Sequence, residues 1–530
     1  MPPVAMSVEA STFLNPKAGF PRNRRFTASA TVFPSPHCRQ RTALPSFRLV
    51  SSGKTAFHAL SNVPAVLESK SGSVVVEEIS DPPVKIVAIV GQGSPSPLKS
   101  AAWEEVMLHT AKRLKWVDEG YEMLVFTDKF CESNGESSVN LLRVADILVI
   151  VGVTNKESVK WVQSNSENVK NIICFESSPD LVNKLGGSYV NRQDEGSFFT
   201  KISKKSNQSL EVVRTVSEAW ERHNSDDIRF CLLVIINAYI KPVPILQNLR
   251  AKGFSTLNCM VKNCGTQILN CLLDPHCRKA LQCLNKCSPV DQVCNYRCIA
   301  SYESSNLEAF SLCVLQKNNC LGLDAKIPDK PYVPPMVNFR GRDLCHEVSE
   351  DIFVGWLGNL NWSWRVVAGQ NPAYDQFPCQ YQLFYRGKAK GSFWYEPVFQ
   401  VKTLEGNMVW RRRKYRVKRG KVPGTFHFTV LDNGVVSNEF WTIVDAPDDL
   451  SWGLFHYSGA ARVAGQSYTG AVLVSPDGAY PNEVQKTRLV SALDSCGIKE
   501  WELYEVDNGS CLDPPLGIPE GSSLHSIIEV

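Results

Sequence analysis

Ten cysteines lie within the 62 residues from Cys259 to Cys320, and only eight more occur in the rest of the chain. An even number at such close spacing is typical of a small module whose apolar core is too small to hold it folded, so that cross-links restrict the unfolded chain instead. Disulfides require an oxidising compartment, which argues against the cytosol. The ten residues are Cys259, Cys264, Cys271, Cys277, Cys283, Cys287, Cys294, Cys298, Cys313 and Cys320.

Zinc binding is the alternative for this module, since zinc sites use pairs of closely spaced cysteines. The three-residue gaps after Cys283 and Cys294 suit such a pair. The residues between the cysteines have helical spacing, as in 267–269 and 280–284. We therefore expect short helices clipped together by disulfides across 255–322, with no metal, and the sequence leaves the connectivity open.

The first residues have the composition of an organellar targeting segment. Residues 1–50 contain one acidic residue, Glu9, against seven lysines and arginines, and they are rich in Ser and Pro. This composition predicts a chloroplast transit peptide, and we assign 1–75 to a leader. The net charge of the whole chain is +4, nearly balanced, so we expect no nucleic acid partner. No apolar run is long enough to span a membrane.

A basic run, 411–421, departs from this balance and alternates with Tyr415 and Val417 like a strand. One interpretation is a solvated edge strand whose charges prevent edge-to-edge pairing. The other is attraction to anionic lipid head groups, which would give peripheral contact with a membrane such as the thylakoid.

Residues 82–250 alternate short apolar runs with helical stretches, which predicts an α/β domain with a parallel sheet. The glycines Gly91 and Gly93 follow the first expected strand, where a phosphate-binding loop would lie. The segment 94–97 (SPSP) stands where that fingerprint needs a glycine opening a helix. A structural turn is therefore favoured over a nucleotide site, and the role of the domain stays open.

Residues 336–515 follow a proline-rich linker at 325–335 and alternate apolar and polar positions between turn signals. About eight short strands at this spacing predict a closed, lipocalin-like antiparallel barrel, wide enough for one elongated ligand. A helix near 482–493, a last strand near 501–504 and a tail at 516–530 complete the expected plan. The predicted fold is thus multidomain, with an α/β parallel-sheet domain, a disulfide-rich helical module and a β-barrel.

Two stretches resemble the violaxanthin de-epoxidase family, and within it the plant de-epoxidase-related members. One is the cysteine series, with intervals of four, six, five, five and three residues. The other is 364–380, which contains the string N-P-x-Y-D-x-F-x-C-Q, and shorter fragments at 439–441, 457 and 470–472 agree. The resemblance covers about 255–512 and leaves out the α/β domain.

The resemblance implies a chloroplast protein of the xanthophyll cycle that reductively removes a carotenoid epoxide with ascorbate as co-substrate. It does not distinguish the thylakoid lumen from the stroma, and it does not indicate an oligomeric state. It also implies six disulfides, five within the module and one from Cys379 to Cys511. Cys345 and Cys496 are extra to these six bonds, and a bond between them is one option. Four further cysteines are expected to be removed or free, namely Cys38, Cys131, Cys174 and Cys231.

The same resemblance implies the site. Asp375 and Glu439 match family acidic positions and are expected to donate protons to the epoxide oxygen, because burial raises the pKa of a carboxyl. Three family side chains are replaced, by Pro378, Gln382 and Val474. We therefore expect an oxidoreductase with an incomplete family site, and a non-catalytic carotenoid or lipid carrier is the alternative. The expected catalytic residues are Asp375, Glu439, Gln380 and Tyr457, and the expected substrate-binding residues are Trp364, Gln382 and Trp441.

Overall fold

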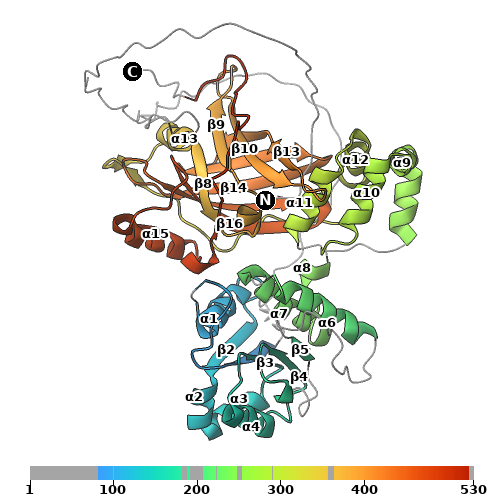
Figure 1. The fold of residues 1–530 in the computed structure, drawn as a ribbon, viewed down its shortest axis with the longest axis vertical. Coiled ribbons are helices and arrows are strands. Elements are labelled where there is room, and N and C mark those ends of the chain that lie inside the picture. The colour runs from blue at the N-terminus through green and yellow to red at the C-terminus, as the bar shows by residue number, and fades with distance from the viewer. Residues whose placement is uncertain are drawn as a thin grey trace, which may run out of the picture.

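The computed structural model describes residues 82–99, 101–181, 188–190, 207–222, 224–247, 254–288, 291–355 and 363–524. The predicted leader, with Cys38, lies outside these residues. Within them the three predicted parts follow one another along the chain, and each is built on its own core (Figure 1). The predicted multidomain fold is confirmed. None of the described helices combines the length and the apolar character needed to cross a bilayer.

The α/β domain contains a five-stranded parallel sheet in the order β2-β1-β3-β4-β5. Its central strands are continuous apolar runs because helices cover both faces. The strands are β1 (Val84–Val90), β2 (Tyr121–Thr127), β3 (Ile147–Val151), β4 (Asn171–Phe175) and β5 (Ser188–Val190). One face packs against α1 (Trp103–Leu114), α6 (Asn207–Trp220) and α7 (Ser225–Tyr239), and the other against α2 (Asp128–Ser133), α3 (Gly135–Arg143) and α4 (Lys156–Asn165).

The glycine after β1 is explained by packing. A Cβ on Gly91 would lie 2.1 Å from the carbonyl oxygen of Gly152, at the end of the neighbouring β3. The loop is closed further by Ser94, whose hydroxyl donates to the Gly91 carbonyl oxygen at 2.7 Å. The close approach of two strand ends therefore requires glycine here, which agrees with the structural turn rather than with a phosphate loop.

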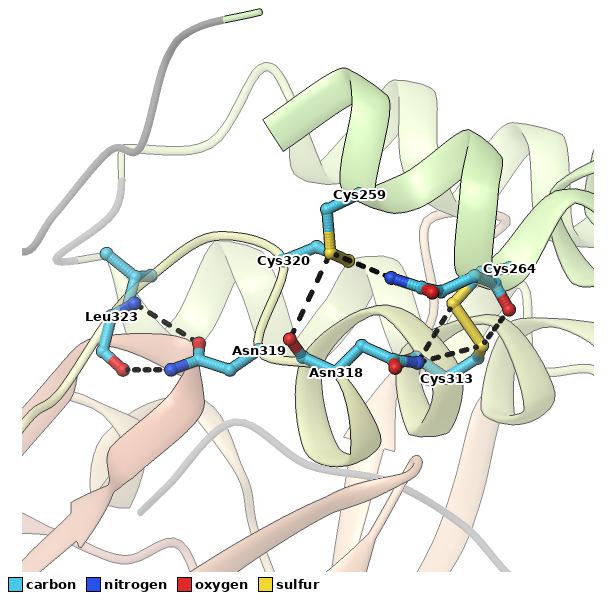
Figure 2. Close-up of a disulfide and its surroundings, with 8 residues drawn as sticks. Cys259, Cys264, Cys313, Asn318, Asn319, Cys320 and Leu323 are labelled. Carbon is cyan, nitrogen blue, oxygen red and sulfur yellow. Dashed lines mark hydrogen bonds between the residues drawn. A yellow bond between two sulfur atoms is a disulfide. The ribbon is translucent and has the colours of Figure 1, made fainter. Parts of the chain in front are cut away.

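The cysteine module is a set of short helices joined by five disulfides. The helices are α9 (Phe254–Leu273), α10 (Pro275–Leu284), α11 (Gln292–Ser301), α12 (Ser305–Ser311) and the π-helical turn η1 (Leu312–Lys317), preceded by α8 (Pro244–Gln247). Figure 2 shows the two bridges that tie α9 to the far end of the module. The pairs are Cys259–Cys320, Cys264–Cys313, Cys271–Cys277, Cys283–Cys298 and Cys287–Cys294.

The barrel closes because β9 pairs with both β8 and β10, which joins the two ends of the antiparallel sheet. In β13 buried and exposed residues alternate, as expected for a strand with one face to the core, whereas β9 and β15 are buried along their whole length. The ring consists of β8 (Trp364–Gly369), β9 (Tyr381–Arg386), β10 (Phe393–Lys402), β12 (Tyr415–Arg419), β13 (Thr425–Asp432), β14 (Val435–Asp445), β15 (Gly453–Ala461) and β16 (Gln466–Ser475).

Further elements flank the ring. The strand β11 (Met408–Arg412) pairs with β10, and β17 (Tyr504–Glu505) pairs with β8. The strands β6 (Asn338–Phe339) and β7 (Arg342–Asp343) form a separate two-stranded sheet. The remaining elements are α13 (His346–Val354), α14 (Ala373–Gln376), η2 (Arg462–Ala464), α15 (Glu483–Ser495) and η3 (Glu500–Glu502).

The prediction of an edge strand for the basic run at 411–421 holds for its start and is wrong for the rest, because Arg411 and Arg412 end β11, which pairs with β10 alone. Its second half, β12, lies inside the closed ring between β10 and β13. Arg412 pairs with Glu396, and Arg413 pairs with the buried Asp432. Arg419 pairs with carboxylates of α13. Much of this charge is therefore neutralised inside the protein.

The disulfide expectations outside the module are met in part. Cys379 and Cys511 are bonded, which ties the start of β9 to the tail as predicted. Cys496 is a buried free thiol at the C-terminal end of α15, so the predicted bond between Cys345 and Cys496 is wrong. Cys345 is disulfide-bonded. Three other cysteines are free as predicted, namely Cys131, Cys174 and Cys231.

A buried carboxylate joins the α/β domain to the barrel. Glu502, in η3, accepts hydrogen bonds from Arg113 at 2.7 Å and from the barrel residue Gln370 at 3.1 Å, and lies 2.8 Å from His109 Nε2. Ser225, at the start of α7, also donates to it. We call this group the Glu502 seam, and it holds α1 and α7 against the residues that follow α15.

Candidate functional site

The candidate site is a small cavity inside the barrel, lined mostly by aromatic side chains. Its volume is about 30 Å³, which holds a few water molecules and not an elongated ligand. The wide ligand cavity expected from the number of strands is therefore filled by side chains, and a ligand enters only if these side chains move. The lining residues are Tyr374, Gln382, Tyr395, Pro397, Phe399, Arg413, Tyr415, Glu439, Trp441, Tyr457 and Tyr468.

One end of the barrel is plugged by α13. Phe353 of this helix stacks against Phe384 and meets Phe426 edge-on, with ring centroids 4.6 and 4.7 Å apart. Trp364 donates its indole N–H to the backbone of the same helix at 3.0 Å. Arg386 holds the helix from β9 through two buried ion pairs. The predicted substrate-binding Trp364 therefore belongs to this plug and is not among the residues that line the cavity.

Glu439 is the carboxylate at the cavity. It lies on β14 and is almost completely buried. Tyr468 donates its hydroxyl to Oε1 at 2.8 Å, and Trp441 donates its indole N–H to Oε2 at 2.6 Å. Burial raises the pKa of Glu439, and these two neutral donors offset the rise only in part. The side chain therefore holds its proton more tightly than an exposed glutamate does.

Three tyrosine rings lie against glycines of the barrel wall. A Cβ on Gly369 would fall 2.2 Å from the ring of Tyr374, and a Cβ on Gly459 would fall 2.4 Å from the ring of Tyr468. Tyr457 covers Gly470 in the same way. The hydroxyls of Tyr374 and Tyr457 are 3.4 Å apart. The missing side chains therefore let the rings lie flat and bring their hydroxyls to the cavity.

Gln382 and Gln380 have different positions. Gln382 lines the cavity and accepts a hydrogen bond from Tyr395. Gln380 is buried outside it, and its amide donates to the backbone carbonyls of Tyr374 and Phe377 at 3.2 and 2.7 Å. Gln380 therefore fixes the loop that carries Tyr374 and lies outside the cavity lining.

The structure does not bring the two predicted acids together. Asp375 lies on α14, is exposed and is not among the cavity-lining residues, although partial burial raises its pKa. Glu439, Tyr457, Trp441 and Gln382 do share the cavity.

Sequence reasoning gave no role to several cavity residues. Arg413 was treated as part of a surface run, yet it lines the cavity and donates to the hydroxyl of Tyr296 in α11 at 2.5 Å. Tyr395, Tyr415 and Tyr468 were not singled out either, although each lies on the inward phase of its strand. The two-residue period of the strands could have identified these residues, because alternate residues of a barrel strand share one face.

Comparison with known proteins gives one family. Residues 256–508 match the family model described as the VDE lipocalin domain. The violaxanthin de-epoxidase of Nicotiana tabacum, a chloroplastic protein, is 23% identical over 274 residues, which cover 50% of this chain and 53% of that protein. The enzyme of Arabidopsis thaliana is 23% identical over 276 residues, covering 50% and 55%. This chain thus spans about half the length of the curated relatives it matches.

Several solved structures align with about a third of this chain. Apocrustacyanin C1 is 12% identical, with a TM-score of 0.22, and covers 34% of this chain and 93% of its own. Lobster apocrustacyanin A1 is also 12% identical, with a TM-score of 0.20 and coverage of 34% and 91%.

Proposed function

Residues 256–508 of this chain belong to the violaxanthin de-epoxidase lipocalin-domain family, and on that premise we propose that the protein reductively opens the epoxide of a xanthophyll or of another lipid. Glu439 is the proton donor in this proposal. The observation that carries it is a carboxyl with a raised pKa, buried in an aromatic cavity and held by two neutral donors.

The chemistry needs two protons and two electrons. Protonation of the epoxide oxygen weakens its bonds to carbon, and the oxygen leaves as water once both protons are added. Ascorbate, the reductant implied by the family, supplies the electrons that restore the carbon–carbon double bond and is oxidised to dehydroascorbate. Glu439 delivers the first proton, and the hydroxyl of Tyr457 orients the oxygen by donating a hydrogen bond. Positioned proton transfer of this kind contributes about 10²–10⁴-fold to a rate.

Substrate entry requires the aromatic lining to move. The cavity of about 30 Å³ does not accommodate a carotenoid end ring, so the loop that carries Tyr374 must open. That loop is held by Gln380, and Asp375 stands on its outer side. In this proposal Asp375 lies at the rim of the barrel and does not protonate the epoxide oxygen. This differs from its predicted role as a second proton donor.

The test is a pigment assay with the full, oxidised chain. Violaxanthin dispersed in galactolipid is incubated with ascorbate at acidic and at neutral pH, and products are separated by chromatography. We expect product at acidic pH, a loss of at least about 100-fold with Glu439→Gln, and at most a small loss with the matched amide variant Asp375→Asn. Equal activity of wild type and Glu439→Gln would overturn the assignment of Glu439.

A non-catalytic carotenoid or lipid carrier is the second candidate. It is favoured by the replacements at Pro378, Gln382 and Val474, and by the separation of Asp375 from Glu439. A carrier would bind violaxanthin, seen as quenching of tryptophan fluorescence, and would form no product at either pH in the wild type. We further propose a chloroplast location, supported by the chloroplastic relatives, in a compartment that maintains the disulfides.

A further inference from the structure

The outer face of α9 carries apolar side chains that stay exposed in the described part of the chain. Five large apolar side chains of this one helix are between 50% and 71% exposed. Figure 1 shows α9 at the outer edge of the cysteine module, on the side away from the barrel. The five are Leu257, Val261, Leu269, Leu272 and Leu273, and we call them the α9 stripe.

The opposite face of α9 is apolar as well, and it is packed. Met260, Cys264 and Ile268 contact the core formed by η1 and α12. A helix that is apolar on both faces is normally buried on both. Within the described residues the outer face of α9 therefore stays exposed, without the cover that such a sequence calls for.

Disulfides prevent the stripe from turning inward. Cys259 and Cys264 are bonded to the end of the module, as Figure 2 shows, and Cys271 is bonded to α10. The backbone of α9 is kinked at Cys264, and bonds on both sides fix the two halves: Cys259 holds the half with Leu257 and Val261, and Cys271 holds the half with the three leucines. The α9 stripe is thus held in the outward position as long as the module is oxidised.

The charges around the stripe are of one sign. Among the described residues from 255 to 322, every exposed charged side chain is a lysine or an arginine. Lys262 neighbours Val261 on α9, and Arg278 reaches the C-terminal end of the stripe, donating to the carbonyl of Leu272 at 3.3 Å. The other exposed basic residues are Lys279, Lys286 and Lys317.

The acidic residues of the module are partly buried, and all but Glu308 on α12 have a partner. Asp274 and Asp291 cap α10 and α11, and Glu303 pairs with Arg411. A second copy of this chain would bring two basic faces together, and like charges oppose that contact. An anionic partner offers the complementary sign, and a bilayer offers apolar depth for leucines as well.

We propose that the α9 stripe docks on a lipid surface that carries anionic head groups. The leucines and Val261 enter the boundary between head groups and acyl chains, while Lys262 and Arg278 remain at the level of the phosphates. The geometry distinguishes this face from the basic run at 411–421, where much of the charge is already paired within the protein. The proposal does not depend on the barrel being catalytic.

The test is co-sedimentation of the full, oxidised chain with vesicles of phosphatidylcholine, with and without phosphatidylglycerol. We expect binding only when phosphatidylglycerol is present, and weaker binding as salt is raised. The double variant Val261→Glu with Leu269→Glu should lower binding at least tenfold, and Lys262→Glu with Arg278→Glu should lower it severalfold. The matched controls Val484→Glu and Leu512→Glu, at exposed apolar residues of α15 and the tail, should bind like the wild type.

Two results would overturn the proposal. One is wild-type binding in the Val261 and Leu269 variant, with loss of binding instead in Arg416→Glu with Lys418→Glu on the exposed face of β12. The other is a wild-type dimer in sedimentation velocity that the stripe variant dissociates, together with no binding to either vesicle. Mass determination of the disulfides in each variant shows whether the module has kept its bonds, so that a folding failure is not counted as lost docking.

Discussion

Two buried glutamates occupy opposite electrostatic settings in this protein. Glu439 in the barrel and Glu502 in the seam are 4% and 3% exposed. Burial alone would raise both pKa values, but Arg113 and His109 beside Glu502 lower its pKa to about 2. Glu439 has Tyr468 and Trp441 as its hydrogen-bond partners, and its pKa is raised.

The difference shows that burial does not by itself determine what a carboxyl can do. A buried carboxylate beside a guanidinium stays charged over the physiological range, and its contribution is to hold two parts together. A buried carboxyl among neutral donors keeps its proton to a higher pH than an exposed one, which is the property that a proton donor requires. The seam is thus suited to structure and the barrel cavity to chemistry.

The largest expected effect comes from removing the cation of the seam. Arg113→Met leaves Glu502 buried without its guanidinium, and breaking such a pair costs about 3–5 kcal/mol of unfolding free energy. Urea denaturation followed by fluorescence measures the loss. The double change Arg113→Met with Glu502→Leu should recover most of it, because no uncompensated charge remains.

The exposed pair Arg214–Glu218, with atoms 3.7 Å apart on α6, provides the control. Arg214→Met should cost no more than about 0.5 kcal/mol, as is usual for surface pairs within a helix. Equal effects of the Arg113 and Arg214 changes would show that the seam does not hold the domains together.

The next effect is on the pH dependence of stability, where the two glutamates should act in opposite directions. The pKa of Glu502 is lowered from 4.5 to about 2, so its stabilisation is present above pH 4.5 and is lost as the pH falls towards 2. The loss amounts to about 3 kcal/mol, at 1.36 kcal/mol per pKa unit. The pKa of Glu439 is raised, so stability falls instead as the pH rises from 4.5 through its folded value.

Subtracting the stability of each variant from that of the wild type at every pH isolates the contributions of Glu502 and Glu439 from those of other titrating groups. Glu502→Gln should flatten the acid side of the stability profile, and Glu439→Gln should flatten the side above pH 4.5. Thermal melts across the pH range measure both. If Glu439→Gln altered the stability only below pH 4.5, the pKa of Glu439 would not be raised by folding.

The seam and the cavity also differ in how far the sequence predicts them. Local spacing was sufficient for the cysteine module and for the barrel strands, because disulfide density and strand period are properties of neighbouring residues. Glu439 was identified through the resemblance to known enzymes. His109 and Glu502 are separated by 393 positions, and no local pattern relates them.

Other differences arise from side-chain packing, which the sequence pattern does not specify. The pattern predicted an eight-stranded ring but not that aromatic rings would fill it, since a filled and a hollow barrel share the same alternation. Arg413 belongs to a basic run in sequence, yet Asp432 from the neighbouring strand pairs with it. A bond from Cys496 to Cys345 was one option, whereas Cys496 is a buried free thiol.

A smaller effect should come from the glycines of the barrel wall. Gly459→Ala places a Cβ 2.4 Å from the ring of Tyr468 and should cost about 1–3 kcal/mol, as overpacking does. Gly265→Ala is the control, since Gly265 follows the kink of α9 at Cys264 and a Cβ there meets nothing within 4 Å. That change should stabilise by about 0.5–1 kcal/mol. A neutral Gly459→Ala would mean that the ring of Tyr468 is free to move.

The smallest expected effect is a shift in the pH profile of the proposed reaction. Tyr468→Phe removes a hydrogen bond to the carboxylate form of Glu439, worth about 0.5–1.5 kcal/mol, and so raises the pKa further by up to about one unit. A proton donor works while protonated, so the decline of activity with rising pH should move upward by the same amount. Tyr374→Phe, which alters a hydroxyl bonded to Tyr457, should leave that limb in place. A shift with Tyr374→Phe and none with Tyr468→Phe would mean that the proton comes from a group other than Glu439.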